Sequence, residues 1–303
     1  MSNDHNATII IRDIRKALAA TEEEAKQKPA CLLVVGGEFN GSIFDLAPGE
    51  NAVGRNPECA ISLDVDGVSR RHCVVSVSQD EVAVTDLGSA NGTYLNDRKI
   101  EATTVLKRGD VIKISTSALK YLPAGDPDRL TYDKLRAEAT TDGLTQCVNK
   151  AHFHQLLAGA VKKCKVTGRP LTLAVFDLDH FKKLNDGHGH DAGDFVLSEM
   201  ARLIRETGLR AGDVFARYGG EEFCILLPDT NLDQGRDAAE RIRQSIERHA
   251  FIYDGQRLAV TASIGVADHG DGVATATDLF KRADAAVYRS KQQGRNRVSI
   301  FQP

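Results

Sequence analysis

The stretch Arg217-Tyr218-Gly219-Gly220-Glu221-Glu222-Phe223 lies between two apolar runs, residues 214–216 and 224–227. This pattern predicts a tight β-hairpin, because adjacent glycines accept the positive φ angles that a two-residue hairpin turn needs. The acids after the glycines are poorly explained by folding alone, although a solvated turn is the ordinary interpretation of an isolated GGEE. Consecutive strand residues point to opposite faces, so we expect Glu221 and Glu222 to have different roles.

A second acidic cluster, Asp177-Leu178-Asp179, ends the apolar run 171–176. A run this apolar is typical of a central strand, and ligand sites in α/β sheets tend to lie at strand ends. If this strand end lies beside the hairpin turn, Asp177 and Glu221 form a site of hard oxygen ligands. Such a site suits Mg²⁺, which commonly uses one or two carboxylates together with substrate phosphates.

Several motifs in matching order resemble the GGDEF family of diguanylate cyclases over roughly residues 140–301. Besides the GGEEF signature they are Asp142-Gly143-Leu144-Thr145, residues 177–186, residues 187–194 and residues 288–295. The resemblance implies that two GTP molecules condense to cyclic di-GMP and release pyrophosphate. Each palm would hold one GTP, so ring closure requires a homodimer, at least a transient one.

The resemblance also implies the metal ligands of this reaction. They are the Asp177 carboxylate, the Leu178 carbonyl and the Glu221 carboxylate, which would hold Mg²⁺, with Mn²⁺ as the alternative. Acids beside a triphosphate are favourable only with a cation between them, because like charges repel. The general base stays open. Glu222 is a secondary catalytic candidate, with an ordinary salt bridge as the alternative.

The same resemblance implies a GTP site. Asn185 and Asp194 match the residues that read the hydrogen-bonding edge of guanine. A plain turn at Asn185 and a helix N-terminal acid at Asp194 are the alternatives. The remaining GTP-binding positions are Phe181, Lys182, Lys291 and Arg295. The three cations among them would otherwise be ordinary surface charges.

Arg210-Ala211-Gly212-Asp213 precedes the hairpin by the spacing of the family's RxxD inhibitory site. There the product cyclic di-GMP would bind as an intercalated dimer and slow the enzyme. A guanidinium suits that role because it forms bidentate hydrogen bonds with phosphate and can stack on a base. Arg241 would contribute more weakly from a second surface. A local salt bridge between Arg210 and Asp213 is the alternative.

The pattern between these motifs supports an α+β palm of the ferredoxin-like kind. Val196, Met200, Leu203 and Ile204 have the spacing of one buried helix face. Further along the chain we expect a helix at about residues 234–249, an alternating strand at 258–267, a helix at about 278–293 capped by Gly294, and a short last strand.

The first half of the chain differs in kind. Short β-like runs at residues 32–35, 72–77, 82–85 and 111–114, separated by turn clusters, predict an all-β sandwich. Gly54-Arg55, Ser69-Arg70-Arg71-His72 and residues 91–96 resemble the forkhead-associated (FHA) family in order and spacing.

FHA domains bind phosphothreonine, so the resemblance implies a phosphopeptide site. Arg55, Ser69 and Arg70 would contact the phosphate, because arginine forks and a serine hydroxyl suit a dianion. Asn91 would hold the peptide main chain, with Thr93 as an assisting residue. Gly54 and His72 are expected to brace the loops.

We therefore expect four segments: a regulatory tail at 1–29, the FHA domain at 30–123, a linker helix at 124–139 and the cyclase domain at 140–303. In the tail, Ile10, Ile14 and Leu18 have helical spacing. A phosphorylated tail threonine, in Thr8-Ile9-Ile10-Ile11 or in Thr21-Glu22-Glu23-Glu24, is one candidate ligand for the FHA domain. A phosphorylated partner protein is the other.

Composition agrees with a two-domain cytoplasmic protein. The net charge of −3 indicates no nucleic-acid surface, and no apolar run reaches the roughly 18 residues of a membrane helix. Six cysteines without a CxxC pair fit a reducing compartment. The alternative function is a catalytically silent cyclic di-GMP sensor that uses its FHA domain as an adaptor. The undegraded GGEEF motif counts against it.

Overall fold

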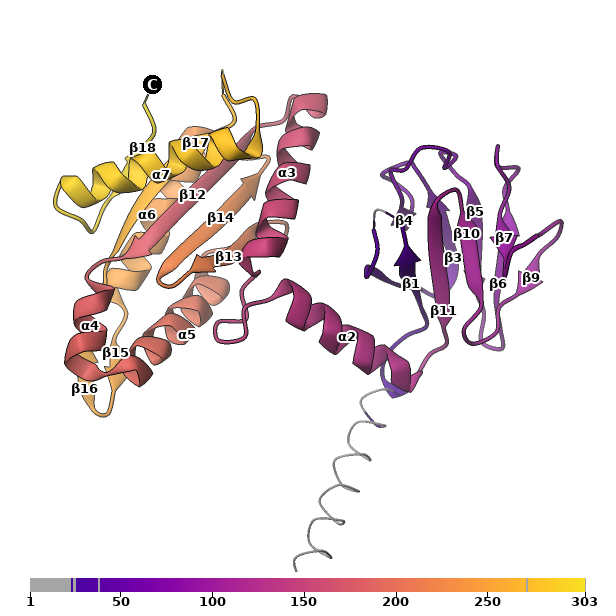
Figure 1. Cartoon of the computed structure of the whole chain (residues 1–303), viewed down its shortest axis with the longest axis horizontal. Coiled ribbons are helices and arrows are strands. Elements are labelled where there is room, and N and C mark those ends of the chain that lie inside the picture. The colour runs from indigo at the N-terminus through magenta and orange to yellow at the C-terminus, as the bar shows by residue number, and fades with distance from the viewer. Residues whose placement is uncertain (1–22, 24–25, 38, 271, 303) are drawn as a thin grey trace, which may run out of the picture. The chain divides into compact units, whose positions relative to one another are not determined.

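A computed structural model describes residues 23, 26–37, 39–270 and 272–302 of the 303-residue chain. It divides into two compact units, one ending at Arg136 and one beginning at Ala137 (Figure 1). The predicted tail helix and the tail threonines Thr8 and Thr21 lie outside the described residues.

The first unit is a β-sandwich, as predicted. One sheet has the order β2 (Ile43–Asp45), β1 (Cys31–Gly36), β11 (Ser117–Leu122), β10 (Val111–Ile114), β7 (Tyr94–Leu95), β8 (Arg98–Lys99). The other has the order β4 (Ile61–Ser62), β3 (Gly49–Gly54), β5 (Cys73–Val77), β6 (Val82–Asp86), β9 (Thr104–Val105). Alternate residues such as Leu32, Val75 and Ile112 fill the core between the sheets, which leaves the loops to carry polar groups.

Helix α2 (Pro127–Thr140) follows the sandwich, where the linker helix was expected. Its first turn is fixed by Asp126, whose carboxylate accepts hydrogen bonds from Arg108 Nε (2.6 Å) and from the Asp128 backbone N–H (2.9 Å). Arg129 is buried and donates to Asp45 (2.8 Å) and Asp133 (2.9 Å). The start of the helix is therefore tied to the sandwich by hydrogen-bonded charges.

The second unit has a five-stranded sheet with the predicted apolar strand at its centre. The order is β13 (Val214–Gly219), β14 (Glu222–Pro228), β12 (Leu171–Leu178), β17 (Ala262–Asp268), β18 (Val298–Ile300). Strand β12 is antiparallel to both of its neighbours. With helices between β12 and β13 and between β14 and β17, this is the predicted ferredoxin-like arrangement.

Helices cover both faces of this sheet (Figure 1). Helices α5 (His190–Thr207) and α6 (Leu232–Arg248) pack on the face that carries Phe176 and Phe223. Helices α3 (Lys150–Thr167) and α7 (Ala276–Gln292) pack on the face that carries Val175 and Cys224. Burial on both faces explains why β12 is apolar at most of its positions. The predicted face of α5 is buried through Val196, Met200 and Ile204.

Two local predictions were wrong. The strand expected at residues 258–267 is interrupted: β16 (Gln256–Leu258) forms a hairpin with β15 (Phe251–Tyr253), and β17 starts only at Ala262. Helix α7 ends at Gln292 with Gln293 as its cap, and Gly294 follows with φ 112°. β17 is buried almost throughout rather than alternately, because helices cover both of its faces.

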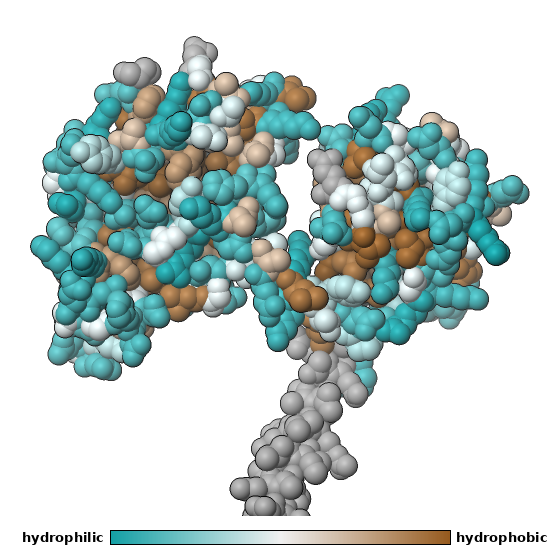
Figure 2. Space-filling view, viewed as in Figure 1, coloured by the Kyte–Doolittle hydropathy of each residue, from teal (hydrophilic) through white to brown (hydrophobic). Residues whose placement is uncertain are grey.

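Hydrophilic residues cover most of the visible face of each unit (Figure 2). Among the described residues, no helix combines the length and the apolar character that crossing a bilayer requires.

Candidate functional site

Strands β13 and β14 form the predicted hairpin. Gly219 pairs with Glu222, so the two residues of the turn are Gly220 and Glu221 rather than the two glycines. Gly220 has φ 51°, in the left-handed region that glycine accepts without strain. The first acid of the motif therefore lies in the turn itself, and the second begins β14.

This register brings Glu222 beside Asp177. The two residues are direct partners across β12 and β14, so their side chains leave the same face of the sheet. We expected Glu221 and Glu222 to lie on opposite faces as consecutive strand residues, and the register of the turn removes the basis of that expectation. Strand alternation does not apply to Glu221, because it is a turn residue. Its carbonyl accepts from the Leu178 N–H (3.3 Å), which places the turn against the end of β12.

Negative charge is concentrated at this strand end. The Asp177 side chain is only 14% exposed, and its carboxylate forms an ion pair with Lys291 Nζ of α7 at 2.8 Å. Burial raises the pKa of Asp177 above its ordinary value, Lys291 opposes that shift, and the charges of Glu221 and Asp179 add to it. Burial and the charge of Asp177 likewise raise the pKa of Glu222.

Asp179 supports the site rather than facing a ligand. Its carboxylate accepts from Thr261 Oγ1 (2.7 Å), Ser263 Oγ (2.6 Å) and the Asn296 backbone N–H (3.0 Å). It thereby ties the end of β12 to β17 and to the loop after α7. We did not foresee this role. The acid itself was visible in the sequence, but its partners lie 82, 84 and 117 residues away.

The loop after α7 brings Arg295 to the same region. Arg295 has φ 66°, its N–H bonds the Ser290 carbonyl (3.0 Å), and the next residue donates to Asp179. Arg295 is exposed. Lys291 therefore contacts the strand end from the last turn of α7, and Arg295 lies in the loop that Asp179 ties to this strand end.

Helix α4 (Phe181–His188) starts three residues beyond the end of β12. Its N-cap residue, His180, has φ 59° and makes no side-chain cap hydrogen bond in the described structure. The first-turn N–H groups of a helix carry partial positive charge and suit a phosphate. Phe181 is buried and anchors this turn in the core, while Lys182 is exposed beside it.

The two predicted guanine readers come from neighbouring helices. Asn185 Oδ1 on α4 is buried and has no hydrogen-bond partner among the described residues. The Asn185 side chain packs against Gly193 of α5, where an added Cβ would stand 1.9 Å from Oδ1. Asp194 is the next residue of α5 and is exposed. An acceptor without a partner beside an exposed carboxylate is the arrangement that guanine donors require.

The residues at the strand end fit a divalent cation. Among the described residues, no group of three or more His, Cys, Asp or Glu side chains has the arrangement of a metal site. The predicted set is smaller, with the carboxylates of Asp177 and Glu221 and the carbonyl of Leu178. All of these are hard oxygen donors, and the crowding of negative charge around Asp177 is relieved by a cation.

Arg210 and Asp213 lie away from this cluster, at the opposite end of the six-residue strand β13. At about 3.3 Å per residue that strand spans roughly 20 Å. The Asp213 carboxylate accepts from the Arg210 backbone N–H (2.8 Å), and within the described residues no ion pair joins it to the Arg210 guanidinium. Arg210 and Arg241, on α6, are both exposed.

In the first unit, the predicted phosphopeptide residues lie on adjoining loops. The Arg55 N–H donates to the Ser69 carbonyl (2.9 Å), and the Ala90 N–H donates to Ser69 Oγ (3.1 Å). Asn91 Nδ2 donates to the Gly67 carbonyl (2.8 Å). Arg55 and Arg70 line one pocket of about 550 Å³. Arg55, Ser69, Arg70 and Asn91 are thus brought to one end of the sandwich.

Gly54 and His72 brace these loops, as predicted. A Cβ at Gly54 would stand 2.3 Å from the Arg70 carbonyl oxygen, so only glycine fits there. His72 is fully buried, and its ring bonds the Ser69 N–H (3.1 Å) and the Gly92 carbonyl (3.2 Å).

Thr93 differs from the other predicted residues. It is fully buried, and its hydroxyl donates to Asp86 Oδ1 (2.6 Å). The same carboxylate accepts from the Gly88 N–H (2.9 Å) and from the Ser89 N–H and hydroxyl. Burial would raise the pKa of Asp86, but the hydrogen bonds from Ser89, Thr93 and Gly88 lower it to about 2. Thr93 therefore stabilises the loop from the interior of the domain. This corrects the expectation that Thr93 assists in holding the peptide.

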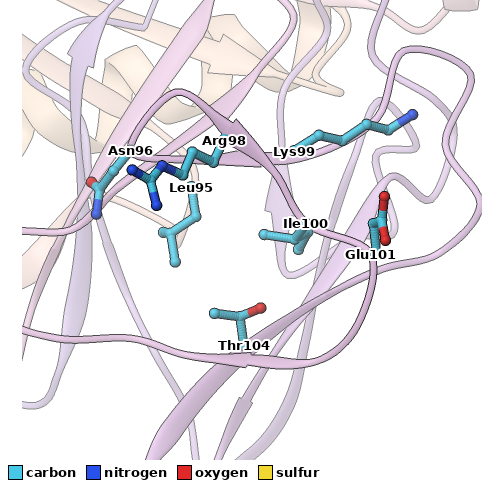
Figure 3. Close-up of a pocket in the computed structure, with 7 residues that line it drawn as sticks. All are labelled: Leu95, Asn96, Arg98, Lys99, Ile100, Glu101 and Thr104. Atoms are coloured by element: carbon cyan, nitrogen blue, oxygen red, sulfur yellow. The ribbon is translucent and has the colours of Figure 1, made fainter.

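A second pocket, of about 620 Å³, opens beside strands β7, β8 and β9 (Figure 3). Its lining residues are Leu95, Asn96, Arg98, Lys99, Ile100, Glu101 and Thr104. Figure 3 shows the side chains of Leu95, Ile100 and Thr104 around the opening, whereas Lys99 extends away from it.

Two family models match the chain. The model described as "Diguanylate cyclase, GGDEF domain" matches residues 139–297, and the FHA domain model matches residues 51–115. The chain is 42% identical to Diguanylate cyclase A of Treponema denticola over 164 residues, which are 53% of this chain and 44% of that protein. It is 44% identical to the response regulator PleD of Caulobacter vibrioides over 163 residues, 53% of this chain and 36% of that one.

These alignments span less than half of either curated relative. Among solved structures, the coiled coil and GGDEF domain of DgcB from Caulobacter crescentus, in complex with c-di-GMP, is similar with a TM-score of 0.53 and 34% identity. That similarity covers 57% of this chain and 91% of the solved DgcB chain. The structure of diguanylate cyclase SiaD of Pseudomonas aeruginosa, in complex with its activator SiaC, is similar with a TM-score of 0.53 and 37% identity. That similarity covers 57% of this chain and 66% of the solved chain.

Proposed function

Since this chain belongs to the GGDEF family of diguanylate cyclases, we propose that it condenses two GTP molecules to cyclic di-GMP and two pyrophosphates. The observation that carries the proposal is the register of β12 and β14. It sets Asp177 and Glu222 side by side, with the Glu221 turn against the same strand end.

The residues around the strand end have different roles in the proposed reaction. Asp177, Glu221 and the Leu178 carbonyl would hold Mg²⁺, with Mn²⁺ as the alternative. A cation there would neutralise phosphate charge and activate the attacking 3′-hydroxyl. Lys291, Arg295 and the N-terminus of α4 with Lys182 would hold the triphosphate oxygens. Glu222 adds a carboxylate on the same sheet face, within reach of the reacting groups.

Guanine would be read between α4 and α5. The unpartnered Asn185 Oδ1 accepts from a base N–H, and the Asp194 carboxylate accepts from the donors N1 and N2 of guanine. Adenine has no such pair of donors on its edge, so the site favours GTP over ATP. Phe181 would act by fixing the first turn of α4 in the core.

One palm holds one GTP, so we propose that catalysis takes place in a homodimer with two palms facing each other. Arg210 and Asp213 are proposed as the site at which cyclic di-GMP inhibits the enzyme, with Arg241 contributing from α6. The exposed Arg210 guanidinium and its distance from the strand end support a separate regulatory site. The cytoplasm supplies GTP and keeps thiols reduced, and all six cysteines are free.

The first unit is proposed to bind a phosphothreonine peptide. Arg55 and Arg70 line one pocket, and Ser69 and Asn91 lie on the adjoining loops, which is the arrangement that a phosphate and a peptide main chain need. Such binding would control the cyclase or bring it to a phosphorylated partner.

Product analysis tests the cyclase. The purified chain is incubated with GTP and Mg²⁺, beside Glu221→Gln and Arg210→Ala, and nucleotides are separated by chromatography. Wild type or Arg210→Ala should form cyclic di-GMP, and Glu221→Gln should form none. If none of the three proteins forms cyclic di-GMP at concentrations that allow dimerisation, while cyclic di-GMP still binds through Arg210, the sensor function is favoured instead.

A further inference from the structure

Lys99 lies against the loop of the proposed phosphopeptide site. An added Cβ at Gly92 would stand 2.6 Å from Lys99 Cε and 3.2 Å from Nζ, so the lysine stem crosses this glycine. Gly92 has φ 76°, which glycine accepts best. Because Gly92 directly follows Asn91, the Lys99 ammonium lies at the edge of the loop that is proposed to hold the peptide.

A continuous set of contacts links Lys99 to the phosphate-binding end. The Arg55 backbone bonds Ser69, and the Ser69 hydroxyl bonds Ala90. Asn91 and Gly92 follow directly, and Lys99 packs on Gly92. The loop residues that connect the proposed phosphate contacts to Lys99 are therefore in direct contact with one another.

The ammonium group of Lys99 is available to pair with a ligand. It is exposed, and among the described residues it forms no ion pair within 4.0 Å. Lys113, which lies two strands away in the same sheet, behaves differently, because it is paired with Asp97. The nearby Asp86 carboxylate is already engaged by Gly88, Ser89 and Thr93.

We propose that Lys99 determines specificity by selecting phosphothreonine peptides with an acidic residue near the phosphate. The proposal rests on the phosphopeptide function of the first unit. Arg55 and Arg70 take the phosphate, and Lys99 takes a carboxylate a few residues along the peptide. The chain's own tail offers a contrasted pair of sequences, since Thr21 is followed by Glu22-Glu23-Glu24 and Thr8 by Ile9-Ile10-Ile11. Lys99 favours the acidic sequence that follows Thr21.

Strand β8 supplies a matched control. Arg98 and Lys99 are consecutive, so their side chains leave opposite faces of the strand. In Figure 3 the Arg98 side chain lies beside Asn96, and Lys99 extends away from it. Arg98→Met removes the same charge from the same strand without touching Gly92. Lys99→Met keeps a flexible stem that can still pack on the glycine.

The test is fluorescence anisotropy with the full chain and labelled peptides. The peptides cover residues 16–28 with phosphorylated Thr21, either as in the chain or with Glu22, Glu23 and Glu24 changed to Gln. An exposed ion pair contributes up to about 1 kcal/mol, so Lys99→Met should weaken the acidic peptide about threefold to fivefold. It should leave the Gln peptide unchanged. Arg98→Met should bind both peptides like wild type.

A phosphothreonine peptide library, read out by mass spectrometry, measures the same selection without choosing a sequence. Wild type should enrich Asp or Glu at one position near the phosphate, and Lys99→Met should lose that enrichment. If Lys99→Met weakens binding of both peptides equally, or leaves the preference for acidic residues unchanged, the proposed role of Lys99 is overturned but the phosphopeptide site is not. A wild type that retains no phosphorylated peptide, or binds as well after Arg70→Ala, would overturn the phosphopeptide site itself.

Discussion

Arg217 and Asp142 form a partly buried ion pair that joins the β13–β14 hairpin to the segment after α2. Arg217 Nη1 lies 3.0 Å from Asp142 Oδ1, and the two side chains are 15% and 26% exposed. Arg217 Nε also donates to the carbonyl of Gly220 (2.9 Å). The Arg217 guanidinium thus contacts both the turn that carries Glu221 and the Asp142 carboxylate. Asp142 lies two residues beyond the end of α2.

We expect Arg217→Met to impair the cyclase without unfolding it. Loss of a charged hydrogen bond of this kind costs about 1.5–3 kcal/mol and frees the turn at Gly220. Denaturant unfolding should show that loss of stability, and the rate of cyclic di-GMP formation should fall at least tenfold. Arg169→Met is the control, because Arg169 pairs with Asp229 at an exposed position (66% and 58%). Equal effects of the two changes would contradict the role of Arg217.

Asp179→Asn should destabilise the second unit. The carboxylate accepts from two hydroxyls and one backbone N–H, and an amide nitrogen would place a donor against one of these donors. We expect a loss of about 1–3 kcal/mol in the free energy of unfolding. GTP binding should weaken as well, because Asn296 and the adjacent Arg295 lose their anchor. Unchanged stability would show that Asp179 does not hold this loop.

Gly54→Ala should abolish phosphopeptide binding. The added Cβ would stand 2.3 Å from the Arg70 carbonyl oxygen, a backbone atom that moves only with its loop. Anisotropy with a phosphothreonine peptide measures the loss. Gly159→Ala is the control, since no atom lies within 4 Å of its added Cβ and alanine is the better helix former there. Normal binding by Gly54→Ala would mean that the close approach does not position Arg70.

Asp86 should make the first unit sensitive to acid. Its pKa is lowered from 3.8 to about 2 in the folded chain. A depressed folded pKa contributes stability that is fully present above the unfolded value and is lost as the pH falls from about 4 toward 2. Hydrogen exchange of residues 82–95 should therefore separate wild type from Asp86→Asn above pH 4. A difference at pH 2 as large as the one above pH 4 would contradict this assignment.

The sequence predicted the fold where its signal was local. The apolar run 171–176 indicated a central strand, and the GGEEF stretch indicated a hairpin, since burial and turn chemistry leave traces in neighbouring residues. The pairing of Glu222 with Asp177 was not predicted, because it depends on which residues occupy the turn. The role of Asp179 was missed, since its partners are hydroxyls and a backbone group that lie 82, 84 and 117 residues away.

The central claim is that two GTP molecules are joined at the strand end formed by Asp177 and Glu221. Its most direct test is mass spectrometry of the nucleotides formed when Mg²⁺ is added to metal-stripped chain and GTP. Wild type should produce cyclic di-GMP and pyrophosphate in a ratio of about one to two, only after Mg²⁺ is added, and Asp177→Asn should produce neither. Product formation without a divalent cation, or at the same rate by Asp177→Asn, would contradict the proposed site.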